Sequence, residues 1–349
     1  MSFLNNLFGG EKRAESAVLI DVGAESVAGT YVCAIGDALP QVLYTRRFPV
    51  EAREGEAQAV AMLRALKLLG DTLVSEGAPV LARATGIGST DSILVSIDAP
   101  WQKMSVRTER FEQKMPFTFT KHMVLSALQK VENALPGQIL TDESIIGTVL
   151  NGYETHEPYG KLVHRASVSV LASYIDERIA KDVRATLQSL YHTKKMILIA
   201  GSSLHCQAIQ TVFPHERDAL ILDAIGPLTS VALIRRGLLT DVVETSGRTA
   251  SAAAWLKEVS AEFAKLAEQF PLPRTIFLLA PESKGSSLKE VLGTTNFGKL
   301  WLSDNPPKIV PVAGSHLSAF VRQAATAPPD LPLLLMALYF QQQRTGDAL

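Results

Sequence analysis

The stretch LIDVGAESVAGTYV at residues 19–32 decides the fold of this chain. An apolar run ends at Asp21, the chain turns at Gly23, and a second apolar run begins after Ser26, which predicts two strands joined by a tight turn. A hairpin with glycine at its tip can direct backbone N–H groups towards a phosphate. An aspartate at the strand end can hold a hydrated magnesium ion. The stretch is therefore either a phosphate-binding hairpin or only a turn.

The same pattern recurs in the second half of the chain. Residues 219–246, ALILDAIGPLTSVALIRRGLLTDVVETS, again alternate strand, turn, strand, turn and strand, as residues 17–50 do. An alignment without gaps places Asp223 on Asp21, and a predicted helix and a further strand follow each copy. Self-similarity of this kind predicts two related domains.

The segment between the two copies predicts a small insert and a crossover. Residues 91–164 are expected to form a compact unit of strand, strand, helix and strand. The strand RASVSVLAS, a helix at about 175–191 and the strand KMILIAG then form a crossover unit, which favours a parallel sheet. The expected division is a flexible leader at 1–16, a first domain at 17–90 and 165–215, the insert at 91–164, and a second domain at 216–349.

Composition places the chain among folded globular proteins. It has 349 residues, of which 47% are hydrophobic, and 34 basic residues stand against 35 acidic ones. This balance gives no overall field that would draw the chain to nucleic acid or an anionic surface. Two cysteines, Cys33 and Cys206, are expected to be reduced thiols of a cytoplasmic protein. The apolar run LPLLLMALYF at 331–340 is too short to span a bilayer and is expected to be a buried helix.

The leader at 1–16 contains the apolar residues Phe3, Leu4, Leu7 and Phe8. It is interpreted as a flexible segment, and the alternative is a weak contact with a membrane surface or a partner. At most, a peripheral membrane contact is expected.

The order of these elements resembles the actin-like ATPase superfamily, and within it the bacterial branch that contains the division protein FtsA and the pilus protein PilM. GEKRAESAVLIDVGAESV is similar to the first phosphate hairpin of the family, and ILDAIGPLTSVALIRRG is similar to the second. NGYETHEPYGKLVHRASVSVLAS looks like the end of the small domain particular to this branch, and LPLLLMALYF looks like its closing helix. The resemblance implies an α/β, ribonuclease H-like fold of two duplicated domains with a small α+β insert.

The resemblance also implies a nucleotide site. ATP and Mg²⁺ are the cofactors to expect, with Asp21 and Asp223 as magnesium ligands. The nucleotide-binding positions that match the family are Asp21, Gly23, Ser26, Asp223, Gly226 and Thr229. The alternative is that the two aspartates are only turn residues at strand ends.

The motifs depart from the family in ways that decide the expected chemistry. Ile225 puts a branched side chain where the backbone approaches phosphate, and Pro227 lacks an N–H donor. The adenosine-binding Gly-Gly is replaced by Ala280, Pro281 and Glu282, and LIAGSSLHCQAI contains no carboxylate to orient water. No catalytic residue is therefore assigned. Hydrolysis is expected to be weak or absent, and nucleotide binding stays open.

The resemblance implies a cytoplasmic scaffold that recruits inner-membrane assembly proteins, most like the PilM component of a type IV pilus or type II secretion platform. In this branch the small domain contacts neighbouring subunits or cytoplasmic segments of membrane partners, so self-association also stays open. WQKMSVRTERF at 101–111 is either a solvated face or such a contact surface. The alternatives are an FtsA-like division protein, although QQQRTGDAL at the end of the sequence shows no amphipathic anchor, and an active Mg-ATP-dependent ATPase.

Overall fold

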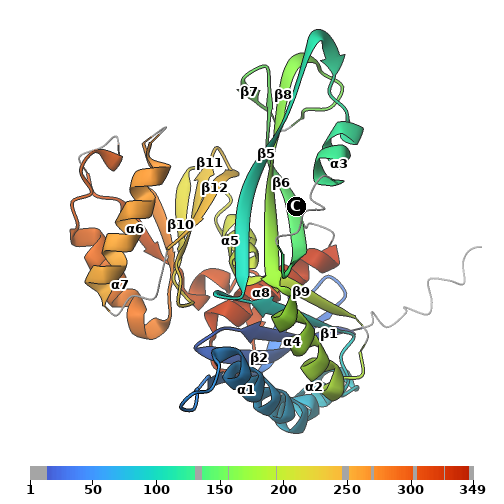
Figure 1. Ribbon diagram of the computed structural model, residues 1–349. Coiled ribbons are helices and arrows are strands. Elements are labelled where there is room, and N and C mark those ends of the chain that lie inside the picture. The colour runs from blue at the N-terminus through green and yellow to red at the C-terminus, as the bar shows by residue number, and fades with distance from the viewer. Residues whose placement is uncertain are drawn as a thin grey trace, which may run out of the picture.

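The computed structural model describes residues 14–129, 136–155, 157–193, 195–245, 251–268, 271–301, 305–325 and 327–345. These residues form three β-sheets with their covering helices. Figure 1 shows two of the sheets in neighbouring domains and the third in a long projection that extends beside the second domain.

The first domain contains a six-stranded sheet. Its strands, in spatial order, are β15 (Arg322–Gln323), β3 (Gln41–Pro49), β2 (Ser26–Ile35), β1 (Ala14–Val22), β4 (Ser92–Ile97) and β9 (Met196–Ala200). The helical segments that lie before its strands β4 and β9 along the chain are α1 (Gln58–Thr72), the π-helical turn η1 (Leu73–Gly77), α2 (Ala78–Thr85) and α4 (Glu177–Leu190). The apolar faces of these helices pack on one side of the sheet in a shared core. Strand β1 is buried on both faces along most of its length, which explains its nearly continuous apolar sequence.

The second domain contains a five-stranded sheet. Its strands, in spatial order, are β12 (Leu238–Glu244), β11 (Ser230–Arg235), β10 (Ala219–Asp223), β13 (Thr275–Leu279) and β14 (Lys308–Pro311). Helices α6 (Ala252–Leu266) and α7 (Glu282–Thr294) pack on one face. The short 3₁₀ segments η3 (Gly298–Leu300) and η4 (Gly314–Leu317) lie before and after β14.

The two sheets have the same topology. In each, three antiparallel strands of a meander are followed by two parallel strands, as β3-β2-β1-β4-β9 and β12-β11-β10-β13-β14. Asp21 pairs with Ala28 in the first hairpin, and Asp223 pairs with Ser230 in the second. The internal repeat read from the sequence is thus a duplication of the fold.

Two helices lie between the sheets. Helices α5 (Gly201–Val212) and α8 (Leu331–Thr345) share one core with the inner faces of both domains. Figure 1 shows both helices between the two sheets. Every residue of α8 from Pro332 to Phe340 is buried. This confirms the prediction of a buried helix for LPLLLMALYF.

The third sheet forms the insert. Its strands, in spatial order, are β5 (Gln102–Thr118), β8 (Leu162–Asp176), β6 (Gln138–Leu150) and β7 (Tyr153–Glu154), all antiparallel, with helix α3 (Lys121–Gln129) beside them. It has a small core of its own around Phe119, Val124 and Leu150.

The structure corrects three of the expected boundaries. The sequence predicts β4 as part of the insert, but it is a central strand of the first sheet, and all six of its residues are buried. The insert sheet therefore starts at β5, and it includes β8, which continues to Asp176, beyond the expected boundary at 164. Strand β15 and helix α8 belong with the first domain's sheet in space, although the sequence places them at the end of the second domain.

Two expectations concern segments that the structure describes only in part. Residues 1–13 of the expected leader lie outside the described residues, while Ala14, Glu15 and Ser16 already belong to β1. Residues 130–135 of the expected insert also lie outside them. Cys33 and Cys206 are free and buried. In the parts of the chain that the structure describes, no helix is long and apolar enough to cross a membrane.

Candidate functional site

The candidate site is built at the carboxyl ends of matching strands. Asp21 is the penultimate residue of β1, and Asp223 is the last residue of β10. Both side chains are buried. The structure brings them together with two residues that the sequence analysis did not select, Asp98 and His205. We call these four residues the aspartate–histidine cluster.

Asp98 directly follows β4 and lies at the start of α5. Its backbone N–H donates to the carbonyl of Val22, and a Cβ atom at Gly201 would overlap its carboxyl oxygen Oδ1. Glycine is therefore required at Gly201 for the helix to start this close to the carboxyl group. Burial, followed by the negative charge of Asp21, raises the pKa of Asp98 well above its usual range. The environment thus favours the protonated carboxyl.

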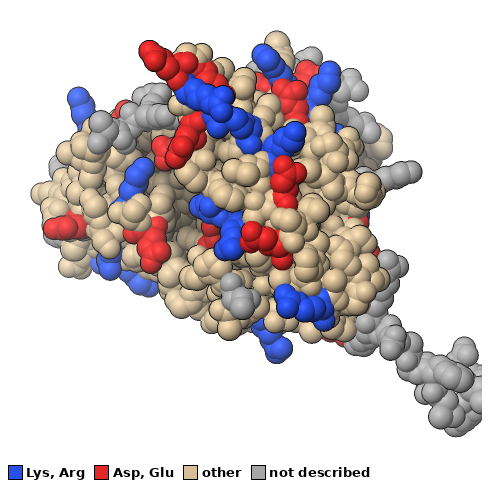
Figure 2. Space-filling view, turned by 90° about the horizontal axis from the view of Figure 1, so that it is seen from below, with Lys and Arg blue, Asp and Glu red and all other residues tan. Residues whose placement is uncertain are grey.

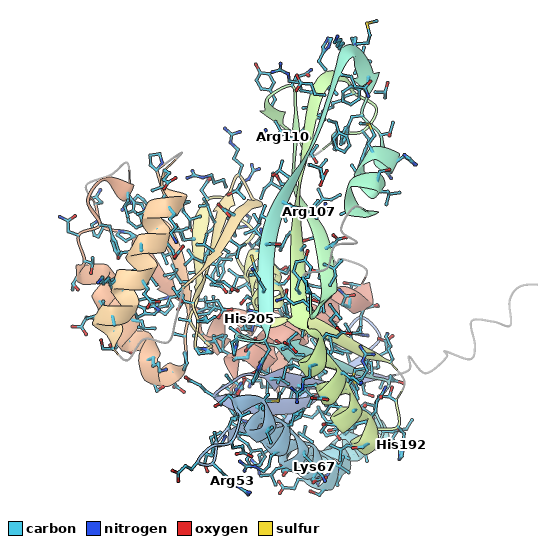
Figure 3. All side chains as sticks on the ribbon, viewed as in Figure 1. Arg53, Lys67, Arg107, Arg110, His192 and His205 are labelled. Atoms are coloured by element: carbon cyan, nitrogen blue, oxygen red, sulfur yellow. The ribbon has the colours of Figure 1, made fainter. Side chains whose placement is uncertain are left out.

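His205 projects from α5 and contacts the second domain. Its Nδ1 lies 2.8 Å from Oδ2 of Asp223, and the side chain is fully buried. Figure 3 shows His205 near the base of β5, between the two domains. Burial opposes the charged imidazole, but the charge and hydrogen bond of Asp223 outweigh it and raise the pKa of His205 to about 9. The other ring nitrogen, Nε2, is buried without a hydrogen-bond partner among the described residues.

Arg47 of β3 occupies the other side of the cluster. Its Nη2 donates to Oδ2 of Asp21 at 2.9 Å, and its Nη1 donates to Oγ of Ser26 at 2.7 Å. Its Nε and Nη2 also donate to the two carboxyl oxygens of Asp330, at 2.7 and 2.9 Å. Asp330 in turn accepts from the backbone N–H of Leu333 in the first turn of α8. Arg47 therefore joins the first hairpin to the start of α8.

A cavity of about 290 Å³ lies beside the second hairpin. Its lining includes the predicted residues Gly226 and Thr229, with Trp255 of α6, Lys284 of α7 and Glu25 from the tip of the first hairpin. Nζ of Lys284 lies 3.8 Å from Oε2 of Glu25, so the rim of the cavity is formed by both domains. Its volume is close to the lower end of the range for small-molecule pockets.

Thr229 is held by protein contacts at this cavity. Its Oγ1 accepts a hydrogen bond of 2.8 Å from Nε1 of Trp255, and its backbone N–H donates to Oγ1 of Thr245. The backbone N–H of Ile225 is also used internally, since it donates to Oδ1 of Asp223 at 3.3 Å. With Pro227 lacking an N–H, the second hairpin has few backbone donors left for a phosphate.

The predicted residues thus fall into two places. Asp21 and Ser26 meet at Arg47, while Gly226 and Thr229 line the cavity. Gly23 closes the first hairpin by donating its N–H to the carbonyl of Ser26 at 3.0 Å. These positions agree with two facing hairpins, and their role in nucleotide binding stays a prediction.

The sequence analysis missed residues that the fold delivers from other elements. Asp98 had a usable signal, because SILVSID ends a buried strand with aspartate as AVLID does. Arg47 and Asp330 are 283 positions apart and gave no common signal. His205 has no neighbours at metal-ligand spacing in the sequence, but that criterion does not test pairing with an aspartate of the other domain.

The chain is similar to solved structures, whereas no protein-family model and no curated protein matches it. A chain of the solved PilM-PilN type IV pilus biogenesis complex is similar, with a TM-score of 0.54 and 15% identity over 95% of this chain and 98% of that chain. A protein of unknown function with an actin-like ATPase fold from Bacteroides thetaiotaomicron VPI-5482 has a TM-score of 0.48 and 9% identity, covering 93% of this chain and 95% of its own.

A further solved structure, the ethanolamine utilization protein EutJ from Carboxydothermus hydrogenoformans, has a TM-score of 0.37 and 11% identity. It covers 93% of this chain and 89% of its own. The duplicated sheets, the helices between them and the likeness to the pilus complex chain over nearly the whole length lead to one conclusion. The chain has a two-domain actin-like fold, in the form seen in a chain of the PilM-PilN complex.

Proposed function

We propose that the chain is a cytoplasmic actin-like scaffold that recruits a membrane assembly protein at the cytoplasmic face of the inner membrane. It is most like the PilM component of a type IV pilus or type II secretion platform, and its nucleotide hydrolysis is weak or absent. The observation that carries this proposal is the likeness to a pilus biogenesis complex chain over 95% of the sequence, insert included. The partner is then a cytoplasmic segment of a membrane protein.

The insert offers the surface for such a partner. Large apolar side chains are exposed at its outer end: Met115 on β5 is 75% exposed, Leu162 at the start of β8 is 66% exposed, and Tyr153 on β7 is 79% exposed. The register pairs Thr118 with Leu162, so the ends of β5 and β8 are neighbours. Exposed apolar side chains gathered at one end of a unit are typical of protein-binding surfaces.

The face of the molecule drawn in Figure 2 carries charges of both signs. In the view of Figure 2, basic and acidic side chains are interspersed over the face seen from below. The net charge of −1 agrees with this distribution. Apolar contacts and backbone pairing at a strand edge, rather than long-range attraction, are therefore the expected basis of partner binding.

Fluorescence polarisation tests the proposal with labelled peptides. The peptides cover the cytoplasmic segments of membrane assembly proteins encoded beside this chain's gene. Met115→Asp and Leu162→Asp should each weaken binding by about tenfold or more, since both place a charge in the apolar contact. Ile87→Asp is the matched control, because Ile87 is 59% exposed but follows α2 of the first domain. Failure of all such peptides to bind at millimolar concentration would contradict the proposal.

An active Mg-ATP-dependent ATPase is the second candidate, and the 290 Å³ cavity at the second hairpin favours it. This candidate predicts phosphate release from ATP that is abolished by Asp21→Ala. A scaffold predicts no release above background and unchanged peptide binding in the same variant.

A further inference from the structure

The contacts of Asp21 and Asp223, the two predicted magnesium ligands, decide whether a magnesium ion fits the aspartate–histidine cluster. Magnesium takes near-octahedral oxygen ligands and keeps several waters, so its carboxylate ligands need free oxygens facing an open space. Oδ2 of Asp21 accepts a hydrogen bond from Arg47. Oδ2 of Asp223 is hydrogen-bonded to Nδ1 of His205, and Oδ1 of Asp223 accepts a hydrogen bond from the backbone N–H of Ile225. Three of the four carboxyl oxygens thus accept hydrogen bonds from the protein.

The remaining oxygen is also poorly placed for a hydrated ion. Oδ1 of Asp21 is buried, and the Asp21 carboxyl group interacts with the carboxyl group of Asp98 through charge and a side-chain hydrogen bond. The space that Asp98 and Asp223 both line measures only about 10 Å³, which is about the room needed for one water molecule. The donor set therefore does not fit a magnesium ion with its waters.

Arg47 supplies a positive charge and lies between two carboxylate groups, as a bound metal cation would. Two buried or nearly buried carboxylates, Asp21 and Asp330, converge on its guanidinium. The contact to Asp330 is bidentate, which is the strongest arrangement of an arginine and a carboxylate. An arginine keeps its charge at every relevant pH, so this cation cannot dissociate from the site.

We infer that Arg47, with His205 on the opposite aspartate, replaces the divalent cation of the actin-like clamp. The two domains of this chain then hold their facing aspartates without magnesium, and any ligand that enters the 290 Å³ cavity binds without it. This inference does not depend on the proposed partner binding.

Thermal unfolding of the full chain tests the inference without any measurement of activity. The titration compares millimolar MgCl₂ with NaCl of matched ionic strength. The variant is Arg47→Met, which removes the charge and keeps an apolar chain. Arg46→Met is the matched control, because Arg46 is the neighbouring residue of β3 and pairs with Glu76 at the exposed surface.

The wild-type protein and the Arg46→Met variant should show no magnesium-specific change in Tm. The Arg47→Met variant should unfold roughly 5 °C or more below the control and should regain part of the loss with a saturable dependence on Mg²⁺. If Arg47→Met does not fold, Arg47→Lys serves instead, since an ammonium group cannot bridge the two carboxylates in the same fork.

Three results would overturn the inference. One is a saturable magnesium-specific rise of Tm in the wild-type protein that Asp21→Asn removes. Another is an Arg47 variant as stable as Arg46→Met, and the third is a folded Arg47→Met variant that gains nothing from Mg²⁺. None of these results changes the expected effect of Met115→Asp on peptide binding, so the two proposals fail separately.

Discussion

Nδ1 of His205 lies 2.8 Å from Oδ2 of Asp223, and this contact joins the two domains. His205 belongs to α5, which continues directly from β9 of the first sheet, while Asp223 ends β10 of the second sheet. Both side chains are buried, so the pair is shielded from water and salt. Its protonation state is therefore coupled to the stability of the fold.

The first prediction concerns the pH dependence of unfolding. The pKa of His205 is raised to about 9 in the folded chain, from 6.5 for an ordinary histidine. Protonation therefore favours the folded state: the full contribution is present below about pH 6.5 and is lost as pH rises through 9. Urea unfolding between pH 6 and pH 9 should show a decline on the order of 3 kcal/mol that His205→Gln lacks.

Asp21 and Asp98 also face His205, so the wild-type curve alone does not isolate the histidine. The difference between the wild-type and His205→Gln curves gives the effect of removing His205 together with its charge interaction with Asp98 and Asp223. Parallel curves over this pH range would show that His205 is not paired as a cation with Asp223.

The second prediction concerns Gly201 at the start of α5. A methyl group there would overlap Oδ1 of Asp98, so Gly201→Ala should destabilise the chain by about 1–3 kcal/mol despite the better helix propensity of alanine. Gly285 in α7 is the matched control. A Cβ atom added at Gly285 would meet no described atom within 4 Å, and Gly285→Ala should be neutral or stabilising.

Chemical denaturation measures both glycine variants. In an Asp98→Ala background the cost of Gly201→Ala should shrink, because the overlapping carboxyl group is gone. An unchanged cost in that background would mean that Asp98 is not the group that requires glycine.

The duplicated fold could be predicted because the signals for its strands, turns and helices are local in the sequence. Buried strands, turn residues and helical spacing occur twice in the same order, and the structure repeats them as two sheets of the same topology. The boundaries were less predictable. The local pattern identifies β4 as a strand, but only its pairing with β1 and β9 places it in the first sheet.

The residues of the candidate site could likewise be predicted only in part. Asp21 and Asp223 follow strands and were found from local pattern alone, whereas Arg47 and Asp330 meet only because β3 and the start of α8 become neighbours in the fold. An arginine in a strand is ordinarily a solvated surface residue. No local feature of the sequence distinguishes Arg47, which reaches the cluster, from Arg46, which faces Glu76 at the surface.

The last prediction concerns the wall of the cavity at the second hairpin. The indole N–H of Trp255 donates to Oγ1 of Thr229, and both side chains are buried. Thr229→Val keeps the shape but leaves this N–H unpaired, so it should cost about 1–3 kcal/mol of stability, measured by urea unfolding. Thr229→Ser keeps the hydroxyl and should lose less, since only a methyl group is removed. Equal losses in the two variants would show that packing of the methyl group, and not the hydrogen bond, fixes Trp255 against the hairpin.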